Sequence, residues 1–404
     1  MFTDMPVAIV DPTRRRFLQK SFIGMGWIMS GGALTHCGGD GALMSNIGAL
    51  GPLQEPDENG IRLPEGFRSR VIARSGELVG SSGYEWHSAP DGGAVFITDD
   101  GGWVYVSNSE TVAQLGGGAG AVRFSRDGEV IDAYSILSGT SVNCAGGATP
   151  WGTWLSCEEK DDGRVWECDP VGITSAVVRP ALGVFKHEAV AIDLDSQVAY
   201  LTEDVGDGGF YRFVADSMID GRADLSAGEL QIAEVVGSGP GGLIEWRTVP
   251  DPSASSTPTR RQVASSTPFD GGEGIWYHDG VIYFSTKGDN RVWAYEDRSS
   301  NLSIIYDAAT SSTPILTGVD NLTVSPAGDV LVAEDGGNME IVAISVDGAI
   351  APVLQVTGQD GSEITGPAFG PSFDRLYFSS QRGTSGVITG VDGVTYEVSG
   401  PFFS

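Results

Sequence analysis

A repeat of about 47 residues constrains the fold of this chain more than any other sequence feature. Each copy contains an apolar strand, a turn, a second apolar strand that ends in an acidic or polar cluster, and often a Gly-rich bend. The second strands end at residues 110, 159, 203, 287, 334 and 381, which leaves gaps of 49, 44, 84, 47 and 47 residues. A four-stranded sheet repeated at this interval is typical of a β-propeller. The six copies predict six blades, and the long gap predicts an insertion between the third and fourth copies.

Composition agrees with a β protein that has many turns. Gly accounts for 58 of 404 residues, and only 19% of the residues are charged, so long amphipathic helices are not expected. We therefore predict an all-β chain with a six-bladed β-propeller over residues 61–404 and an inserted loop region at residues 214–268. The Ser/Thr/Pro-rich residues 249–268 read as an exposed loop, and the Gly-rich residues 38–60 read as a flexible tether.

The first 37 residues resemble an export leader. Residues 13–20 read TRRRFLQK, which is typical of a twin-arginine signal, and the apolar run that follows is too short and too Gly-rich to span a membrane. Cys37 lies in a sequence that resembles a lipoprotein cleavage box, so lipid attachment there is one expectation. We expect twin-arginine export to the periplasm or the extracellular space, with no membrane span. A basic N-terminal arm on a cytosolic protein is the alternative interpretation.

The predicted mature chain is strongly acidic. Removing residues 1–37 leaves 20 basic and 51 acidic residues, a net charge of −31. Nucleic acids and anionic membranes are therefore poor partners. A phosphorylated substrate would also be repelled, unless bound cations reverse the field locally.

Outside the leader the chain has three cysteines. Cys157 and Cys168 are close enough in sequence to form a local disulfide in an oxidising compartment, and paired and free states both remain open. Cys144 is then the odd thiol, either buried and inert or a metal ligand.

One stretch brings a thiol and a carboxylate together. Residues 143–159 read NCAGGATPWGTWLSCEE, with a tight turn between two short predicted strands. An antiparallel hairpin returns the chain to its starting point, so Cys144 and Glu159 should lie side by side. A thiolate beside a carboxylate suits iron or zinc better than magnesium.

Further pairs recur at the same phase of the repeat. The predicted pairs, 14 or 15 residues apart, are Cys144/Glu159, Glu188/Glu203, Glu273/Lys287 and Asp320/Glu334. Seven of these eight side chains can bind a cation, and Glu110 ends the second strand of the first copy. Acidic residues at strand ends are ordinarily turn residues. Several at one mouth of a propeller channel favour a metal cluster, because converging carboxylates repel each other without cations.

The donor types indicate the ions and the chemistry. Carboxylate oxygens suit calcium, and Cys144 indicates a softer ion as well. Two metals that share carboxylates stabilise an in-line displacement at phosphorus. Lys287 could bind a phosphate oxygen or form a simple salt bridge. The sequence contains no G-x-S-x-G elbow, P-loop or H-E-x-x-H motif.

These motifs resemble the PhoX-type alkaline phosphatases. Besides residues 143–159 and the leader, the resemblance rests on Asn108-x-Glu110, His187-Glu188-Ala-Val, Glu203-Asp204, Tyr211-Arg-Phe213, Asp320-Asn-Leu322 and Gly366-Pro-Ala-Phe369. It implies an exported phosphomonoesterase on a six-bladed propeller that uses two Fe³⁺ and several Ca²⁺ ions to hydrolyse a small phosphorylated substrate.

The resemblance also implies roles for individual residues. Cys144 resembles the iron-ligating cysteine, and the residues predicted as metal ligands are Cys144, Glu159, Glu188, Glu203, Glu273, Asp320, Glu334 and Glu110. The predicted catalytic residues are Glu273 and Lys287. Two features depart from the family: the chain is short, and Gly271 stands where the family has an arginine at the active site. A calcium-dependent propeller lactonase and a non-catalytic, metal-stabilised propeller are therefore alternatives.

Overall fold

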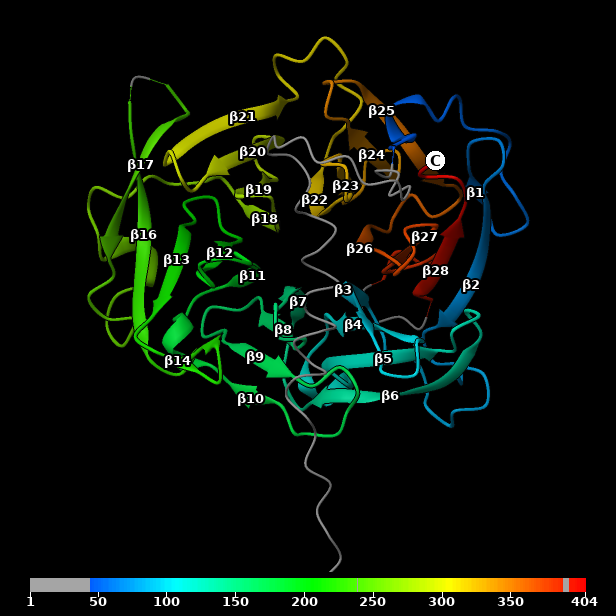
Figure 1. Ribbon diagram of the computed structural model, residues 1–404, viewed down its shortest axis with the longest axis horizontal. Helices are drawn as coiled ribbons and strands as arrows, with labels where there is room; N and C mark the ends of the chain where they lie inside the picture. Colours follow the sequence, from blue (N-terminus) through cyan, green and yellow to red (C-terminus); the bar gives the residue numbers. More distant parts are fainter. Residues whose placement is uncertain (1–43, 238, 388–391) are drawn as a thin grey trace, which may run out of the picture. The chain divides into compact units, whose positions relative to one another are not determined.

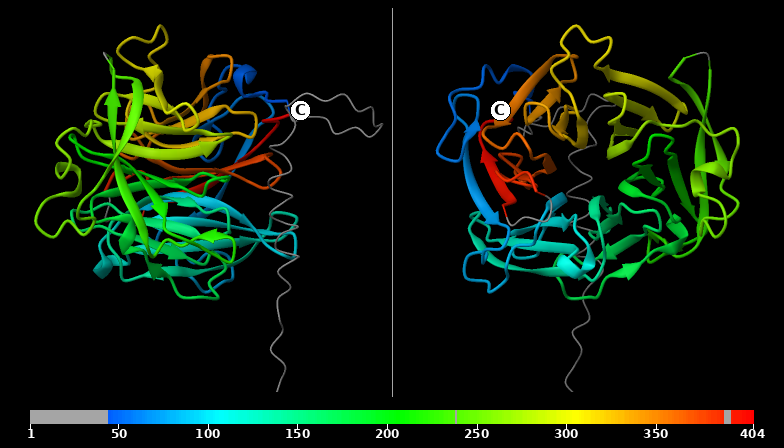
Figure 2. Two further views of the ribbon diagram at one scale, coloured as in Figure 1. Left: turned by 60° about the vertical axis from the view of Figure 1, so that its left-hand side comes forward. Right: turned by 180° about the vertical axis from the view of Figure 1, so that it is seen from behind.

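The computed structural model describes residues 44–237, 239–387 and 392–404. The predicted leader and Cys37 lie outside these residues. The described chain is built from β-strands and short 3-10 turns, and Figure 1 shows its sheets arranged around a common centre, as in a propeller. The view from behind in Figure 2 shows the same circular order. Within the described residues, no helix is long and apolar enough to cross a membrane.

Four sheets have four or five strands. The first contains β3 (Pro90–Ile97), β4 (Trp103–Ser109), β5 (Gly118–Phe124) and β6 (Val130–Ser138). The second contains β7 (Asn143–Ala148), β8 (Trp154–Glu158), β9 (Val165–Cys168) and β10 (Val177–Val178). The third contains β22 (Val319–Val324), β23 (Val330–Glu334), β24 (Glu340–Ile344), β25 (Ile350–Val356) and β1 (Ile61–Arg62). The fourth contains β26 (Ile364–Phe369), β27 (Arg375–Ser380), β28 (Val394–Ser399) and β2 (Arg68–Arg74).

The remaining strands form one nine-stranded sheet and one small hairpin. In spatial order the large sheet contains β11 (His187–Ile192), β12 (Ala199–Glu203), β13 (Phe210–Ala215), β16 (Gly228–Val236), β17 (Gly242–Thr248), β21 (Asn301–Asp307), β20 (Arg291–Glu296), β19 (Val281–Thr286) and β18 (Gly272–His278). The hairpin contains β14 (Met218–Ile219) and β15 (Arg222–Ala223). The 3-10 turns are η1 (Ile47–Ala49), η2 (Ala113–Leu115), η3 (Pro180–Leu182) and η4 (Thr259–Arg261).

The region predicted as an inserted loop is partly sheet. β16 pairs with β13 from Tyr211↔Ile232 to Ala215↔Gly228, and β17 pairs with β16. The reason is burial: Leu230 and Ile232 alternate with more exposed neighbours and pack into the core. Only two residue pairs join β17 to β21, so the nine-stranded sheet has a narrow seam at that point.

The two ends of the described chain close the structure. β1 adds to the sheet of β25, and β2 pairs with β28 along its whole length. An N-terminal strand thus completes a sheet built from the C-terminal end, which covers an edge that would otherwise be open. The expected tether also contacts the C-terminal end of the chain. Ser45 forms an isolated β-bridge with Phe403, and the side chain of Ile47 is buried.

The innermost strands contact one another in a closed ring. β3, β7, β11, β18, β22 and β26 each contact the next, and β26 contacts β3. Glycines permit this approach: a Cβ at Gly147 would lie 1.7 Å from the Val190 carbonyl oxygen, and one at Gly274 would lie 2.5 Å from the Leu322 nitrogen. The Gly-rich inner strands are therefore a packing requirement.

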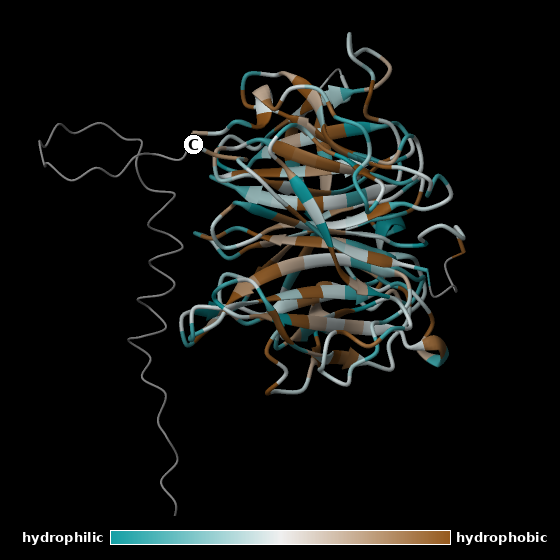
Figure 3. Ribbon diagram, turned by 90° about the vertical axis from the view of Figure 1, so that its right-hand side faces the viewer, coloured by the Kyte–Doolittle hydropathy of each residue, from teal (hydrophilic) through white to brown (hydrophobic). Residues whose placement is uncertain are grey.

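Apolar side chains from the strands fill the space between consecutive sheets, and Figure 3 shows hydrophobic segments along the strands. The two ends of the nine-stranded sheet pack on each other in the same way, where Phe210 on β13 stacks on Phe284 of β19 with ring centroids 4.5 Å apart. Each such buried aromatic side chain contributes about 1.5–3 kcal/mol. This packing fixes how neighbouring sheets present their inner strands.

The described cysteines are all free. Cys157 and Cys168 are buried thiols, so the local disulfide is not formed. In the β8–β9 ladder Cys168 lies opposite Trp154, three residues from Cys157. An odd offset places the two side chains on opposite faces of the sheet, and they enter different core clusters.

Candidate metal centre

The candidate centre is built from the same position in each inner hairpin. The ladder pairs Asn143↔Glu158, His187↔Glu203, Gly272↔Thr286 and Val319↔Glu334 close one end of four hairpins. A register shift follows each pair. Such a bulge re-aims the adjacent side chains. The next residues on the inner strands are Cys144, Glu188, Glu273 and Asp320, and the next residues on the second strands are Glu159, Asp204, Lys287 and Asp335.

The first and last repeats continue this pattern. The ladder pair Pro90↔Ser109 is followed by Asp91 and Glu110, and the pair Ile364↔Ser380 is followed by Thr365 and Gln381. We call the twelve residues at these positions the ring. Gln381 donates to Glu110 at 2.7 Å and also to Asp91, so the two ends of the ring are joined.

Two predicted ligands point elsewhere. Glu203 accepts from the Gly209 amide at 3.0 Å, the Tyr211 hydroxyl at 2.6 Å and Arg260 at 3.0 Å. Glu334 accepts from the amides of Thr317 and Glu340 at 2.9 and 3.0 Å. Both residues stand one position before the ring, and a shift of one residue along a strand moves a side chain to the opposite face. Glu203 and Glu334 therefore hold loops and belong to none of the acidic groups described below.

Ring carboxylates, the Cys144 thiol and Glu363, which forms a β-bridge with Asp335, gather in groups whose ligand atoms lie within 4.8 Å of one another. These groups are Cys144/Glu159/Glu188, Asp91/Glu110/Glu363, Glu188/Glu273/Asp320 and Asp320/Asp335/Glu363. Glu188, Asp320 and Glu363 each belong to two groups, so the groups are continuous. Six predicted ligands, namely Cys144, Glu159, Glu188, Glu273, Asp320 and Glu110, are brought together here.

Cys144 lies in the interior of this arrangement. Its Sγ is 3.3 Å from Glu188 Oε1 and 3.7 Å from Asp91 Oδ2. Burial, followed by the charges of Asp91 and Glu188, raises the pKa of the thiol well above its usual range. A bound cation would reverse this effect, because it stabilises the thiolate.

Burial and mutual repulsion disfavour the ionised form of several ring carboxylates, so the pKa values of these groups are raised. Burial and Glu273 hold the pKa of Glu188 well above its usual range, and burial and Asp320 do the same for Glu273. Burial and Glu159 raise the pKa of Glu110 to about 7. Without a cation, these acids would keep protons at pH values where surface carboxylates are ionised.

The donor set fits a group of metal ions. Glu188 Oε2 is buried and has no hydrogen-bond partner among the described residues. Buried polar atoms without partners are rare and call for a ligand. The Cys144 group offers one sulfur with two carboxylates, which suits iron, whereas the other groups offer only oxygen, which suits calcium.

Three basic side chains form ion pairs with acids of this centre, and one of them, Lys287, is itself a ring residue. Lys287 Nζ lies 2.9 Å from Glu273 Oε1, 3.2 Å from Asp335 Oδ2 and 3.7 Å from Asp320 Oδ2. Arg382 lies 2.9 Å from Glu363, and Lys186 lies 2.9 Å from Glu159. Burial lowers the pKa of Lys287, but Asp320, Glu273 and Asp335 outweigh it and raise that pKa.

Several site residues were not predicted: Asp91, Asp204, Asp335, Glu363, Gln381, Arg382 and Lys186. The acidic doublets at residues 158–159, 203–204 and 334–335 carried a usable signal. In the first doublet the predicted ligand is the second residue, Glu159, and the second residues of the other two doublets are Asp204 and Asp335.

Gly271 adjoins the ring with φ +71°, and a Cβ there would lie 3.1 Å from Asp204 Oδ1. A side chain at this position would therefore be strained.

Comparison with known proteins identifies one family, over residues 92–303. The family model described as alkaline phosphatase PhoX matches residues 92–167 and 160–303. Among solved structures, PhoX from Pseudomonas fluorescens in complex with vanadate, a transition-state analogue, is similar, with a TM-score of 0.72 and 17% identity over 89% of this chain and 98% of that chain. A gluconolactonase from Xanthomonas campestris has a TM-score of 0.50 and 12% identity, over 87% of this chain and 98% of that one. Among curated proteins, none matches this sequence.

Proposed function

Because this chain belongs to the PhoX family of alkaline phosphatases, which are phosphomonoesterases, we propose that its ring is a metal-dependent active site for small phosphomonoesters. One observation carries this proposal: Cys144 and the acids of separate repeats gather into four continuous ligand groups. The similarity to a PhoX structure that holds vanadate supports a phosphate ester as the substrate.

The proposed ions follow from the donor atoms. Cys144, Glu159 and Glu188 would hold iron, and the all-oxygen groups around Asp320 and Glu363 would hold calcium. We propose two Fe³⁺ and several Ca²⁺ ions, with Glu188 and Asp320 shared between neighbouring groups. Bound there, the cations would supply charge neutralisation for an in-line displacement at phosphorus.

The chain's own residues prepare this site. The inner strands and their bulges hold the acids rigidly, and Gln381 ties Asp91 to Glu110. Glu273 would act as a metal ligand in the group that it forms with Glu188 and Asp320. Arg382, paired with Glu363 and Asp335, and Lys186, paired with Glu159, place further positive charge near an incoming phosphate.

Lys287 has a different role from the predicted phosphate contact. Its ammonium group lies among Glu273, Asp320 and Asp335, which come from three different strand ends. This geometry supports the salt-bridge interpretation. Lys287 therefore takes the place of one cation and neutralises ring charge in the absence of an ion.

The sheet order supports a count of six blades. The nine-stranded sheet divides at the β17–β21 seam into a part that starts at β11 and a part that starts at β18. Each part then has one innermost strand, as does each of the four smaller sheets.

The leader remains the basis of a proposal on localisation. Residues 13–20 favour twin-arginine export to the periplasm or beyond, and Cys37 is a candidate for lipid attachment. Replacing Arg15 and Arg16 by Lys should retain the protein in the cytoplasm in a cell-fractionation assay. Unchanged export of that variant would refute the twin-arginine route.

The test of function combines turnover with elemental analysis. The protein purified without added metal should hydrolyse p-nitrophenyl phosphate and contain both iron and calcium. Lactone hydrolysis with calcium alone would support the lactonase alternative, whose structural likeness shows only the fold. Bound metal without turnover of either substrate would support the non-catalytic alternative that Gly271 raises.

A further inference from the structure

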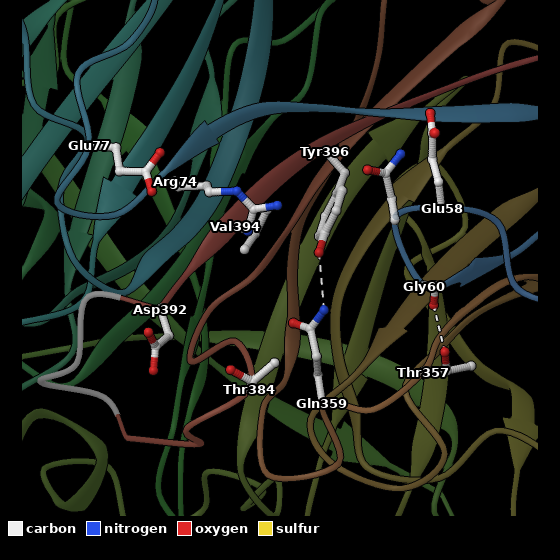
Figure 4. A pocket seen from close by; sticks show the side chains of 11 residues that line it. Glu58, Gly60, Arg74, Glu77, Thr357, Gln359, Thr384, Asp392, Val394 and Tyr396 are labelled. Atoms are coloured by element: carbon white, nitrogen blue, oxygen red, sulfur yellow. Dashed lines mark hydrogen bonds between the residues drawn. The ribbon is translucent and has the colours of Figure 1, made fainter.

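A cavity is lined by residues outside the ring. It has a volume of about 440 Å³ and lies between the sheet of β1 and β25 and the sheet of β2 and β28. Figure 4 shows its lining, which includes Glu58, Arg74, Glu77, Gln359, Asp392 and Tyr396. The volume is in the range of small-molecule sites, about 300–1,000 Å³. None of these residues belongs to the ring.

Gln359 gives the cavity an unpartnered polar atom. Its side chain is only 6% exposed, and its Nε2 donates to the Tyr396 hydroxyl at 3.0 Å. Its Oε1 is buried without a hydrogen-bond partner among the described residues, and in Figure 4 this oxygen points into the space between Val394 and Thr384. A buried amide oxygen in this state can accept a hydrogen bond from a bound molecule.

Arg74 adds an unpaired donor group. Arg70, on the same strand, pairs with Glu397 at 2.7 Å, whereas no described residue forms an ion pair or a side-chain hydrogen bond with the guanidinium group of Arg74. Glu58, Glu77 and Asp392 line the same cavity, which gives it a formal charge of −2 with Arg74 included. The wall therefore offers both donors and acceptors, with an excess of negative charge.

We propose that this cavity binds a neutral, hydroxyl-rich molecule of mono- or disaccharide size. A hydroxyl group can donate to Gln359 Oε1 and to the carboxylates, and it can also accept from Arg74. A phosphate ester would be repelled by the net negative charge, and an ammonium ligand would leave Arg74 without an acceptor. This second site shares no residue with the ring.

Calorimetric titration of the metal-loaded protein with glucose and with maltose tests the proposal. At least one of the two sugars should bind saturably. Gln359→Leu and Arg74→Ala should each weaken that binding at least tenfold and leave hydrolysis of p-nitrophenyl phosphate unchanged. Arg68→Ala is the matched control, because Arg68 lies at the other end of β2 and bonds Ser399.

Thermal unfolding of each variant checks that it is folded. Arg74 is exposed, so its variant tests the site even if Gln359→Leu does not fold. The proposal is overturned if neither sugar binds, if binding survives Arg74→Ala unchanged, or if putrescine binds in place of both sugars.

Discussion

Cys144 Sγ lies 3.3 Å from Glu188 Oε1, although the two residues belong to different sheets and are 44 positions apart. The contact joins a thiol to an acid that is also within reach of Glu273 and Asp320. Through Glu188, the sulfur-containing group is therefore continuous with an all-oxygen group. This relationship underlies the first prediction.

Cys144→Ser should lose iron and at least 100-fold in phosphatase kcat/KM while the fold is retained, because serine replaces a soft ligand with a poor one. Iron content by elemental analysis and activity on p-nitrophenyl phosphate measure the two effects. Cys157→Ser is the matched control, since Cys157 is a buried thiol of the neighbouring strand outside the ligand groups. Full iron content in Cys144→Ser would disprove the ligand role.

The second prediction concerns the adjacent residues Glu334 and Asp335. Asp335→Asn should reduce bound calcium, because Asp335 contributes to a ligand group. Glu334→Gln should keep the calcium but lower the free energy of unfolding by about 1–2 kcal/mol, because it weakens the hydrogen bonds from the backbone amides of Thr317 and Glu340. Elemental analysis measures the calcium, and denaturant unfolding measures the stability. Loss of calcium from Glu334→Gln, with calcium retained in Asp335→Asn, would show that Glu334 is the ligand in place of Asp335.

The third prediction concerns Lys287 as an internal cation. Lys287→Met leaves Glu273, Asp320 and Asp335 without their ammonium partner. In the presence of chelator, the free energy of unfolding should fall by about 1–3 kcal/mol, and with excess calcium the variant should bind more calcium than the parent protein.

Lys160→Met serves as its control. Lys160 pairs at 2.9 Å with Asp162, whose side chain is 84% exposed, and only at 3.7 Å with Glu158, so its loss should cost at most about 1 kcal/mol. An unchanged calcium content in Lys287→Met would contradict the internal-cation role.

The fourth prediction is the pH dependence of the metal-free protein. Burial and Glu159 raise the pKa of Glu110 from 4.5 to about 7, so the folded state binds more protons than the unfolded state between these values. Stability is therefore greatest below about pH 4.5 with respect to this group and decreases as the pH rises towards 7, by up to about 3 kcal/mol. Urea unfolding with chelator at pH 5 and pH 8 measures this change.

Calcium should reduce or reverse that dependence. Bound cations favour the ionised carboxylates, so the stabilisation by calcium should be larger at pH 8 than at pH 5. Equal stability of the chelated protein at both pH values would show that the ring acids are not held in the protonated form.

Much of the architecture could be predicted from local pattern. The spacing of apolar strands located the inner hairpins, and closure of the hairpin at residues 143–159 brought Cys144 to Glu159. Hairpin pairing depends on neighbouring residues, which a single sequence displays. The loop assignment for residues 214–268 was wrong where β16 pairs with β13. The hairpin of β14 and β15 separates these two strands in the sequence, so their pairing does not follow from neighbouring residues.

The sequence alone determined the repeat, the all-β class and the family, because strand period and motif spacing are properties of the chain itself. The tertiary structure decided which acids face the centre. Glu203 and Glu334 bond to loops, and the residues that follow them, Asp204 and Asp335, belong to the ring. Closure of the chain brings Asp91 and Glu363 into one group, although 272 positions separate them. Such contacts depend on how distant strands pack, and a one-residue change of phase reverses the face of a strand side chain.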